Sequence, residues 1–269
     1  MSMAQNKSAA STAWKIIVGV LVALLVLVLV AEFGLRWFVG DKMKTQLREN
    51  AESDGVVMQE DPSVNFGASP LVIGVLSGTI GQINMDVPST LDISDAGIKG
   101  QPAAQLEVTD LEMNSETAGH LVATTTLPDD FLLKTFQDSL REQSGLDMLG
   151  DIVVTDITSQ DAENVLEVQL GGGLATLSLS PHAVDGNLKI EATKSTLFGM
   201  ELPAEVTEQI TQSLSDGLSE QMAGNALTIE DVQVQDGTLK ITVAGDNVNL
   251  SEAQNAAGGA ANEQDSQPA

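Results

Sequence analysis

The segment Ser63–Val87, SVNFGASPLVIGVLSGTIGQINMDV, contains the signals that decide the fold. Ser69 and Pro70 are typical of a helix start, because serine caps free amide groups and proline fits the first helical turn. The residues after Pro70 are almost all apolar, and Gly78 is typical of a helix end. Apolar and polar residues then alternate as far as Val87, which predicts a half-buried strand. The segment therefore predicts a short apolar helix that leads directly into a sheet.

Strand signals outnumber helix signals in the rest of the chain. The expected strands are Leu106–Met113, Leu121–Leu127, Ile152–Ile157, Val165–Leu170, Leu174–Leu179, Leu188–Ala192, Leu227–Val234 and Leu239–Val243. Two longer helices are expected, at Pro128–Arg141 and Leu202–Met222. The dipeptides Asp185-Gly186 and Asp236-Gly237 are hairpin turn signals. The pattern indicates an α+β domain with antiparallel strands.

Residues separated by 75 positions repeat one pattern. Leu127-Pro128 precedes the first long helix and Leu202-Pro203 precedes the second. Val154-x-Asp156-Ile157 likewise matches Ile229-x-Asp231-Val232. Chance similarity of short strand-like segments is the alternative, but one offset shared by two separate stretches favours a structural repeat. We predict a unit of one helix and one strand hairpin, used twice.

The second long helix has a winding apolar row. It consists of residues every four positions: Leu202, Val206, Ile210, Leu214, Leu218 and Met222. Because each residue turns a helix by about 100°, this row drifts by about 40° at each step. A twisted sheet curling round the helix would cover such a row, whereas a flat partner would not. The alternative is an ordinary amphipathic helix with additional contacts.

The N-terminal region predicts one transmembrane helix, Trp14–Phe38. It contains the unbroken apolar run Ile16–Ala31 and aromatic residues at both ends, and its length of about 37 Å is enough to cross a bilayer. Glu32 and Arg36, four residues apart, are expected to pair while extending outward. A cleaved signal peptide is the alternative, although Ala31-Glu32-Phe33 is a poor cleavage site.

Acidic residues dominate the chain. There are 38 Asp and Glu against 12 Lys and Arg, for a net charge of −26. Nucleic acid is excluded as a partner, because its binding needs a basic face, and electrostatic docking on anionic lipid is disfavoured. Solubility explains the acidity as well as a cation-binding role does. A short N-terminus without acids before a long acidic domain indicates that the N-terminus stays inside.

No residue pattern predicts catalysis, a cofactor or a metal site. Cysteine is absent, which excludes disulfides and thiolate chemistry. Neither a His-Glu-x-x-His motif nor a Gly-Lys-Ser/Thr phosphate loop occurs. Gly74-x-x-Ser77-Gly78 lacks the central serine of the esterase elbow. We therefore expect no enzymatic activity, no cofactor and no metal ion.

Two stretches resemble the LmeA family of actinobacterial envelope proteins. One is Ser63–Val87, and the other runs from Leu202-Pro203 through Asp236-Gly237 to Leu250. The likeness is a pattern of apolar, Gly and Pro positions over about Val56–Leu250. It implies phospholipid binding, a role in cell-envelope glycolipid or polysaccharide assembly, and a tubular lipid-binding fold of curved antiparallel sheets wrapped on two long helices. The family implies no catalytic residue.

These expectations combine into one organisation. It comprises a short cytoplasmic N-terminus (1–13), a transmembrane helix (14–38), a stalk (39–55), a lipid-binding-like domain (56–250) and a disordered acidic tail (251–269). The domain is expected outside the cell membrane, holding a phospholipid or lipid-linked precursor. Its tentative apolar groove is formed by Pro70, Leu71, Val72, Ile73, Val75 and Leu76 at the mouth, and by Leu214, Leu218 and Met222 on the wall.

Three alternatives stay open at this point. The apolar turn Leu71–Leu76 is either the mouth of a groove or plain core under the first strand. The protein either carries lipid or is an interaction protein that stabilises a membrane glycosyltransferase without carrying lipid. An envelope hydrolase is the third class of function.

Overall fold

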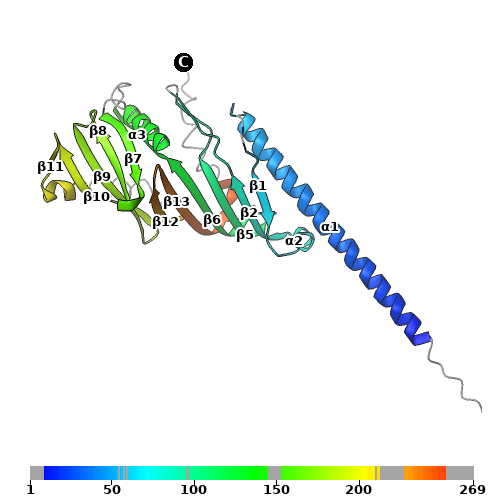
Figure 1. Cartoon of the computed structure of the whole chain (residues 1–269). Helices are drawn as coiled ribbons and strands as arrows, with labels where there is room; N and C mark the ends of the chain where they lie inside the picture. Colours follow the sequence, from blue (N-terminus) through cyan, green and yellow to red (C-terminus); the bar gives the residue numbers. More distant parts are fainter. Residues whose placement is uncertain are drawn as a thin grey trace, which may run out of the picture.

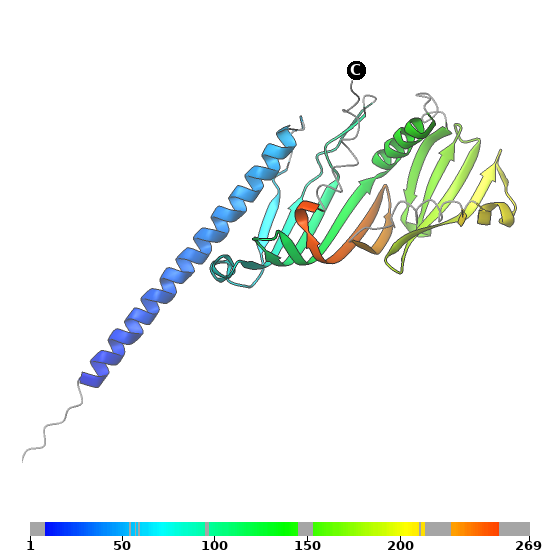
Figure 2. The same ribbon diagram turned by 180° about the vertical axis from the view of Figure 1, so that it is seen from behind.

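The chain folds as an α+β protein with antiparallel sheets, as predicted. The computed structural model describes residues 9–53, 55–56, 58, 60–94, 97–144, 153–209, 211–212 and 227–252. The helices are α1 (Ala9–Ser53), α2 (Leu71–Ser77) and α3 (Asp129–Ser144), with a short 3-10 helix at Asp161–Glu163. In Figures 1 and 2 two sheets follow one another along an elongated body, and the N-terminal half of α1 projects beyond it.

The first sheet has six strands in the order β1-β2-β5-β6-β13-β12, and every pairing is antiparallel. Its strands are β1 (Ser63–Phe66), β2 (Thr79–Val87), β5 (Ala103–Glu112), β6 (Thr117–Pro128), β12 (Thr228–Gln235) and β13 (Thr238–Asn249). Between β2 and β5 the chain forms a separate hairpin of β3 (Asp92–Ser94) and β4 (Gly97–Lys99).

The second sheet has five strands in the order β11-β10-β9-β8-β7. Its strands are β7 (Val154–Gln160), β8 (Val165–Leu170), β9 (Ala175–Val184), β10 (Asn187–Leu197) and β11 (Met200–Glu201). The predicted turn between β9 and β10 is present, with Asp185 at φ 53° and Gly186 at φ 77°. Positive φ at both positions is what a two-residue hairpin turn of type I′ requires.

The body has two apolar clusters, one toward each end. Leu35, Val39 and Met43 of α1 pack against a cluster under the first sheet that includes Leu71 and Ile83. The second cluster joins Leu132 of α3 to residues of β7, β8, β9, β12 and β13. The segment predicted as a stalk is therefore helical as far as Ser53, and Val39 and Met43 of this segment pack against the cluster under the first sheet.

The predicted repeat of 75 residues is present in the backbone. α3 begins at Asp129, directly after Pro128, and helical residues begin again at 204, directly after Pro203. β7 has a register shift between Val154 and Asp156, and β12 has one between Ile229 and Asp231. Both hairpins therefore have a β-bulge at the same position of the repeat, and bulges are specific features of a fold and not defects. The copies also touch, because the Asp161 amide donates to the Asp236 carboxylate at 3.1 Å.

Several predictions extend past the described residues. Residues 204–209 and 211–212 are helical, but residues 210 and 213–222 of the predicted helix Leu202–Met222 lie outside the described part of the chain. Ser251 and Glu252, the first residues of the predicted disordered tail, are helical, and residues 253–269 lie outside the described part. The tubular wrapping on two long helices therefore stays a prediction. In the part of the chain that the structure describes, no helix is long and apolar enough to span a membrane. Of the predicted span, the side chains of residues 14–21 and 23–25 lie outside that part.

Candidate functional site

The predicted apolar turn forms helix α2, and its side chains divide between core and surface. Leu71 is only 2% exposed and belongs to the cluster under the first sheet. Ile73 and Leu76 are 61% and 82% exposed. Gly74 faces the sheet so closely that a Cβ there would lie 2.8 Å from the Thr79 carbonyl oxygen. α2 thus rests on β2 through one side and presents aliphatic side chains on the other.

The N-terminus of α2 is capped by Glu32 of helix α1. The Leu71 amide donates to Glu32 Oε1 at 2.7 Å, and the Val72 amide donates to Oε2 at 2.9 Å. A carboxylate is favoured there because the first amides of a helix lack internal partners and carry partial positive charge. The predicted Ser69 cap is wrong, since the cap position is Pro70 and makes no side-chain hydrogen bond. The predicted end at Gly78 is confirmed, with φ 84°.

Arg36 completes this contact between α1 and the chain before α2. Its Nε donates to Glu32 Oε1 at 2.6 Å, which confirms the predicted pair. The predicted outward direction is wrong, because Arg36 also donates to the carbonyl oxygens of Phe66 at 2.7 Å and Ser69 at 2.8 Å. Both ionic groups are therefore used to fix α2 against α1. We call Glu32, Arg36 and the four backbone groups they bind the clamp.

Large apolar side chains of α1 lie next to the clamp in the sequence and are exposed. Phe33 and Trp37 follow Glu32 and Arg36 directly and are 71% and 72% exposed. Toward the N-terminus, Val26–Val30 are also exposed. Figure 1 shows α2 beside the middle of α1, close to where the N-terminal half of α1 leaves the body. The clamp therefore holds the exposed face of α2 at this part of α1.

The structure brings part of the predicted groove together. Pro70 is exposed, Val72 is half-buried, and Val75 is exposed on the outer side of α2. Leu71 belongs to the core, so its prediction as a mouth residue is wrong. The turn is therefore core at Leu71 and exposed apolar surface at Ile73, Val75 and Leu76. The predicted wall residues Leu214, Leu218 and Met222 lie outside the described residues.

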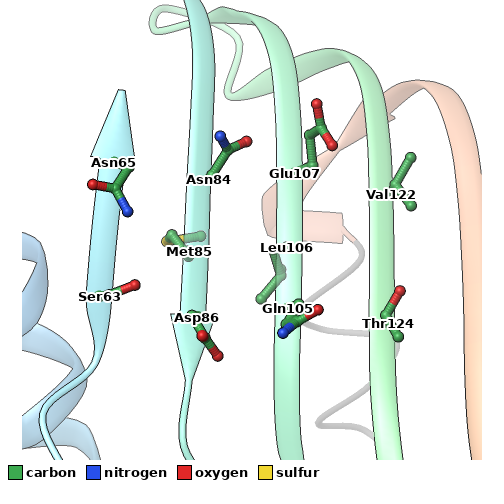
Figure 3. Close-up of a pocket in the computed structure, with 10 residues that line it drawn as sticks. All are labelled: Ser63, Asn65, Asn84, Met85, Asp86, Gln105, Leu106, Glu107, Val122 and Thr124. Atoms are coloured by element: carbon green, nitrogen blue, oxygen red, sulfur yellow. The ribbon is translucent and has the colours of Figure 1, made fainter. Parts of the chain in front are cut away.

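A hollow on the first sheet is lined mostly by polar residues, with Met85, Leu106 and Val122 as its apolar members. Registered rows cross four strands: Asn65, Asn84, Glu107 and Val122 in one, and Ser63, Asp86, Gln105 and Thr124 in the next. Figure 3 shows the side chains that line it. Its two carboxylates and three carboxamides suit hydrogen-bonding groups and not an acyl chain. Alternation along single strands did not reveal this hollow, because it depends on how four strands align.

Neither a metal site nor a close relative of known structure helps to define the site. Among the described residues, no group of three or more acidic or histidine side chains is placed to hold a metal ion. No curated protein and no solved structure matches the chain. The model of the LmeA-like phospholipid-binding family matches residues 30–244. That range begins two residues before Glu32 and includes the clamp, α2 and both sheets except the last residues of β13, so the chain belongs to the LmeA-like phospholipid-binding family.

Proposed function

We propose that this chain is a membrane-anchored, extracytoplasmic phospholipid-binding protein that supports assembly of cell-envelope glycolipid or polysaccharide. The observation that carries the proposal is the clamp, which fixes an exposed aliphatic helix face next to the apolar part of α1 in a member of a phospholipid-binding family. Lipid binding follows from the family, while the anchor, the location and the role in assembly are the further steps of the proposal.

The anchor is supported by the run Ile16–Ala31 and by the exposed apolar residues of α1. With this run in a bilayer, Phe33 and Trp37 lie at the depth where aromatic side chains concentrate, at the boundary with water. Glu32 and Arg36 lie in the same turns of α1 as Phe33 and Trp37. Because the clamp joins α2 to these turns, it also sets the depth of α2 relative to the bilayer. The protein is strongly acidic, so approach to the bilayer depends on the anchor and not on charge attraction.

α2 supplies apolar surface for an acyl chain at this depth. Ile73 and Leu76 lose water when a lipid chain covers them, and each aliphatic side chain contributes about 1.5–3 kcal/mol when fully buried. The hollow of Figure 3, which is lined mostly by polar residues, offers less of this gain. We therefore assign the entry of lipid to the exposed face of α2.

The experiment is lipid extraction from the full-length chain purified in a detergent that contains no phospholipid. We expect the native chain to retain phospholipid, identified by mass spectrometry, and the variant Ile73→Ser/Leu76→Ser to retain several-fold less. Leu174→Ser is the matched control, because Leu174 is also exposed but lies in the turn before β9. Absence of phospholipid from the native chain, together with a retained membrane glycosyltransferase, would replace this proposal by the interaction-protein alternative.

A further inference from the structure

A second hollow lies between α3 and the β3–β4 hairpin. It has a volume of about 390 Å³, within the range of small-molecule sites. Residues of one face of α3 line it together with two residues of β3: Asp130, Leu133, Lys134, Gln137 and Arg141 from the helix, and Ile93 and Ser94 from the strand. The hollow therefore combines cationic, hydrogen-bonding and apolar side chains.

Lys134 and Arg141 stand out because positive charge is scarce in this chain. From residue 50 onward there are six basic residues against 35 acidic ones, and these two face the same hollow. Of the basic side chains that the structure describes, Lys134 alone is buried, with 11% of its side chain exposed. A buried ammonium loses hydration, so lysine is rarely placed there unless an anion compensates. The hollow of Figure 3, by contrast, is lined by Asp86 and Glu107 and by no basic residue.

The two cations converge on one point. Lys134 Nζ lies 3.7 Å from Asp138 Oδ1, and Arg141 Nη1 donates to the same oxygen. The lysine distance is longer than a hydrogen bond, so this ion pair leaves hydrogen-bonding capacity of the ammonium unused. Asp138 therefore keeps the two cations close together, and an anionic group arriving from the hollow would meet both of them beside this carboxylate. Asp130, the one acid lining the hollow, lies four residues before Lys134 on the same face of α3, makes no ion pair with this lysine in the described part of the chain, and accepts the Phe131 amide at 2.9 Å.

Beside the cations the hollow is apolar. Leu133 also packs on the second apolar cluster, and Ile93 faces α3 from the hairpin. Gln137 ties this face to β7, since its Nε2 donates to the Val154 carbonyl oxygen at 2.8 Å. A free phosphate uses only the cations, whereas a phosphodiester with a glycerol and acyl chains also uses Leu133 and Ile93.

We propose that Lys134 and Arg141 bind the phosphodiester of a phospholipid in the hollow between α3 and the β3–β4 hairpin. This inference rests on the proposed function and adds the position of the head group. α2 precedes the start of β2 and α3 follows the end of β6, so α2 and α3 lie at opposite ends of the first sheet, as Figure 1 shows. The hollow is lined by α3 and therefore lies at the end away from α2. The nine residues of β2 span about 30 Å. A lipid whose phosphate binds at this end has left the bilayer, so the site is that of a carrier.

The test is calorimetric titration of the full-length chain, in an uncharged detergent, with dihexanoyl phosphatidylglycerol, dihexanoyl glycerol and inorganic phosphate. Loss of one charge-assisted contact weakens binding on the order of tenfold. We expect this loss of phosphatidylglycerol affinity in Lys134→Met and in Arg141→Gln. Lys134→Arg keeps the charge and should stay near the native affinity, as should Lys189→Gln, a charge removal on the exposed surface of β10. Arg141 is less buried than Lys134, so Arg141→Gln serves if Lys134→Met does not fold.

The other two ligands identify the source of the phosphate. Inorganic phosphate should bind far more weakly than the lipid, and phosphate affinity equal to that of the lipid would overturn the lipid assignment. The affinity for dihexanoyl glycerol should not change in Lys134→Met, and an equal loss for this uncharged ligand would show that the variant damages the fold. If the native chain retains phospholipid and folded variants retain as much, the head-group site is wrong while the proposed function stands.

Discussion

Glu32 is the single residue on which the placement of α2 depends. Its two carboxylate oxygens accept the first two amides of a helix that lies 39 residues further along the chain. Glu32 is itself fixed by Arg36, which reaches two carbonyl oxygens before α2. Charged hydrogen-bond partners in a half-buried contact leave unsatisfied groups behind when one is removed.

Replacing Glu32 by Gln should loosen α2. One amide loses its charged acceptor and Arg36 loses its counterion, so the free energy of unfolding should fall by about 1–3 kcal/mol. Hydrogen exchange of the peptide that includes Leu71 and Val72 should become faster. Glu49→Gln, an exposed position of the same helix, is the matched control. Equal exchange in the two variants would contradict the clamp.

Leu71 and Leu76 should respond oppositely to the same substitution. Leu71→Ala leaves a cavity under the first sheet and should cost about 2–5 kcal/mol of stability. Leu76→Ala removes an exposed side chain and should change stability by less than about 0.5 kcal/mol. Thermal unfolding of the two variants checks this prediction. Similar melting temperatures would show that α2 does not rest on the sheet through Leu71.

At the scale of elements, the close approach of α2 and β2 depends on a glycine. A side chain at position 74 has no room, because the Thr79 carbonyl oxygen and the Ile80 Cα lie within 3.4 Å of an added Cβ. α2 is followed by β2 after the single residue Gly78. The helix can therefore lie flat on its own strand only where no Cβ separates them.

Gly74→Ala should displace α2 from the sheet and cost about 1–3 kcal/mol. Gly34→Ala makes the same change in α1, where nothing lies within 4 Å. Alanine has the higher helix propensity, so this control should be neutral or stabilising by up to about 1 kcal/mol. Urea unfolding of both variants measures the difference. A Gly74→Ala variant as stable as the control would contradict the close packing.

For the whole molecule, the proposed topology puts almost all of the acidic residues on one side of a membrane. Only three of the 38 acidic residues precede Asn50, whereas six of the 12 basic residues do. The elongated body extends from α1 and α2 at one end to the second sheet at the other (Figures 1 and 2). A chain attached at the α1 end would therefore project its second sheet away from the bilayer.

The absence of cysteine makes this topology directly measurable. Ala162→Cys, at an exposed position of the 3-10 helix, should react with a membrane-impermeant maleimide on intact cells. Ser2→Cys should react only after lysis, because the N-terminus is proposed to stay inside. The native chain gives the background, since it has no thiol. Labelling of Ser2→Cys in intact cells would reverse the orientation.

The sequence by itself determined the local elements. The strand Thr79–Val87 was predicted to its ends, and so were the stop at Gly78 and the turn at Asp185-Gly186. These features depend on a residue's own φ preference or on alternation within one strand, so a few neighbouring residues encode them. The repeat of 75 residues was also readable, because it is a property of the chain and not of its partners.

Only the tertiary structure decided which side chain caps α2, which side chains are buried and which line the hollow beside α3. It gave the cap of α2 to Glu32 instead of Ser69, because a carboxylate distant in sequence reaches the free amides. It buried Leu71 and exposed Leu76, because α2 packs on β2 and α1 through only part of its surface and a helix turns successive residues to different sides. It also brought Lys134 and Arg141 against a hairpin more than 30 residues earlier. Such contacts depend on how distant elements meet, which local sequence preferences do not encode.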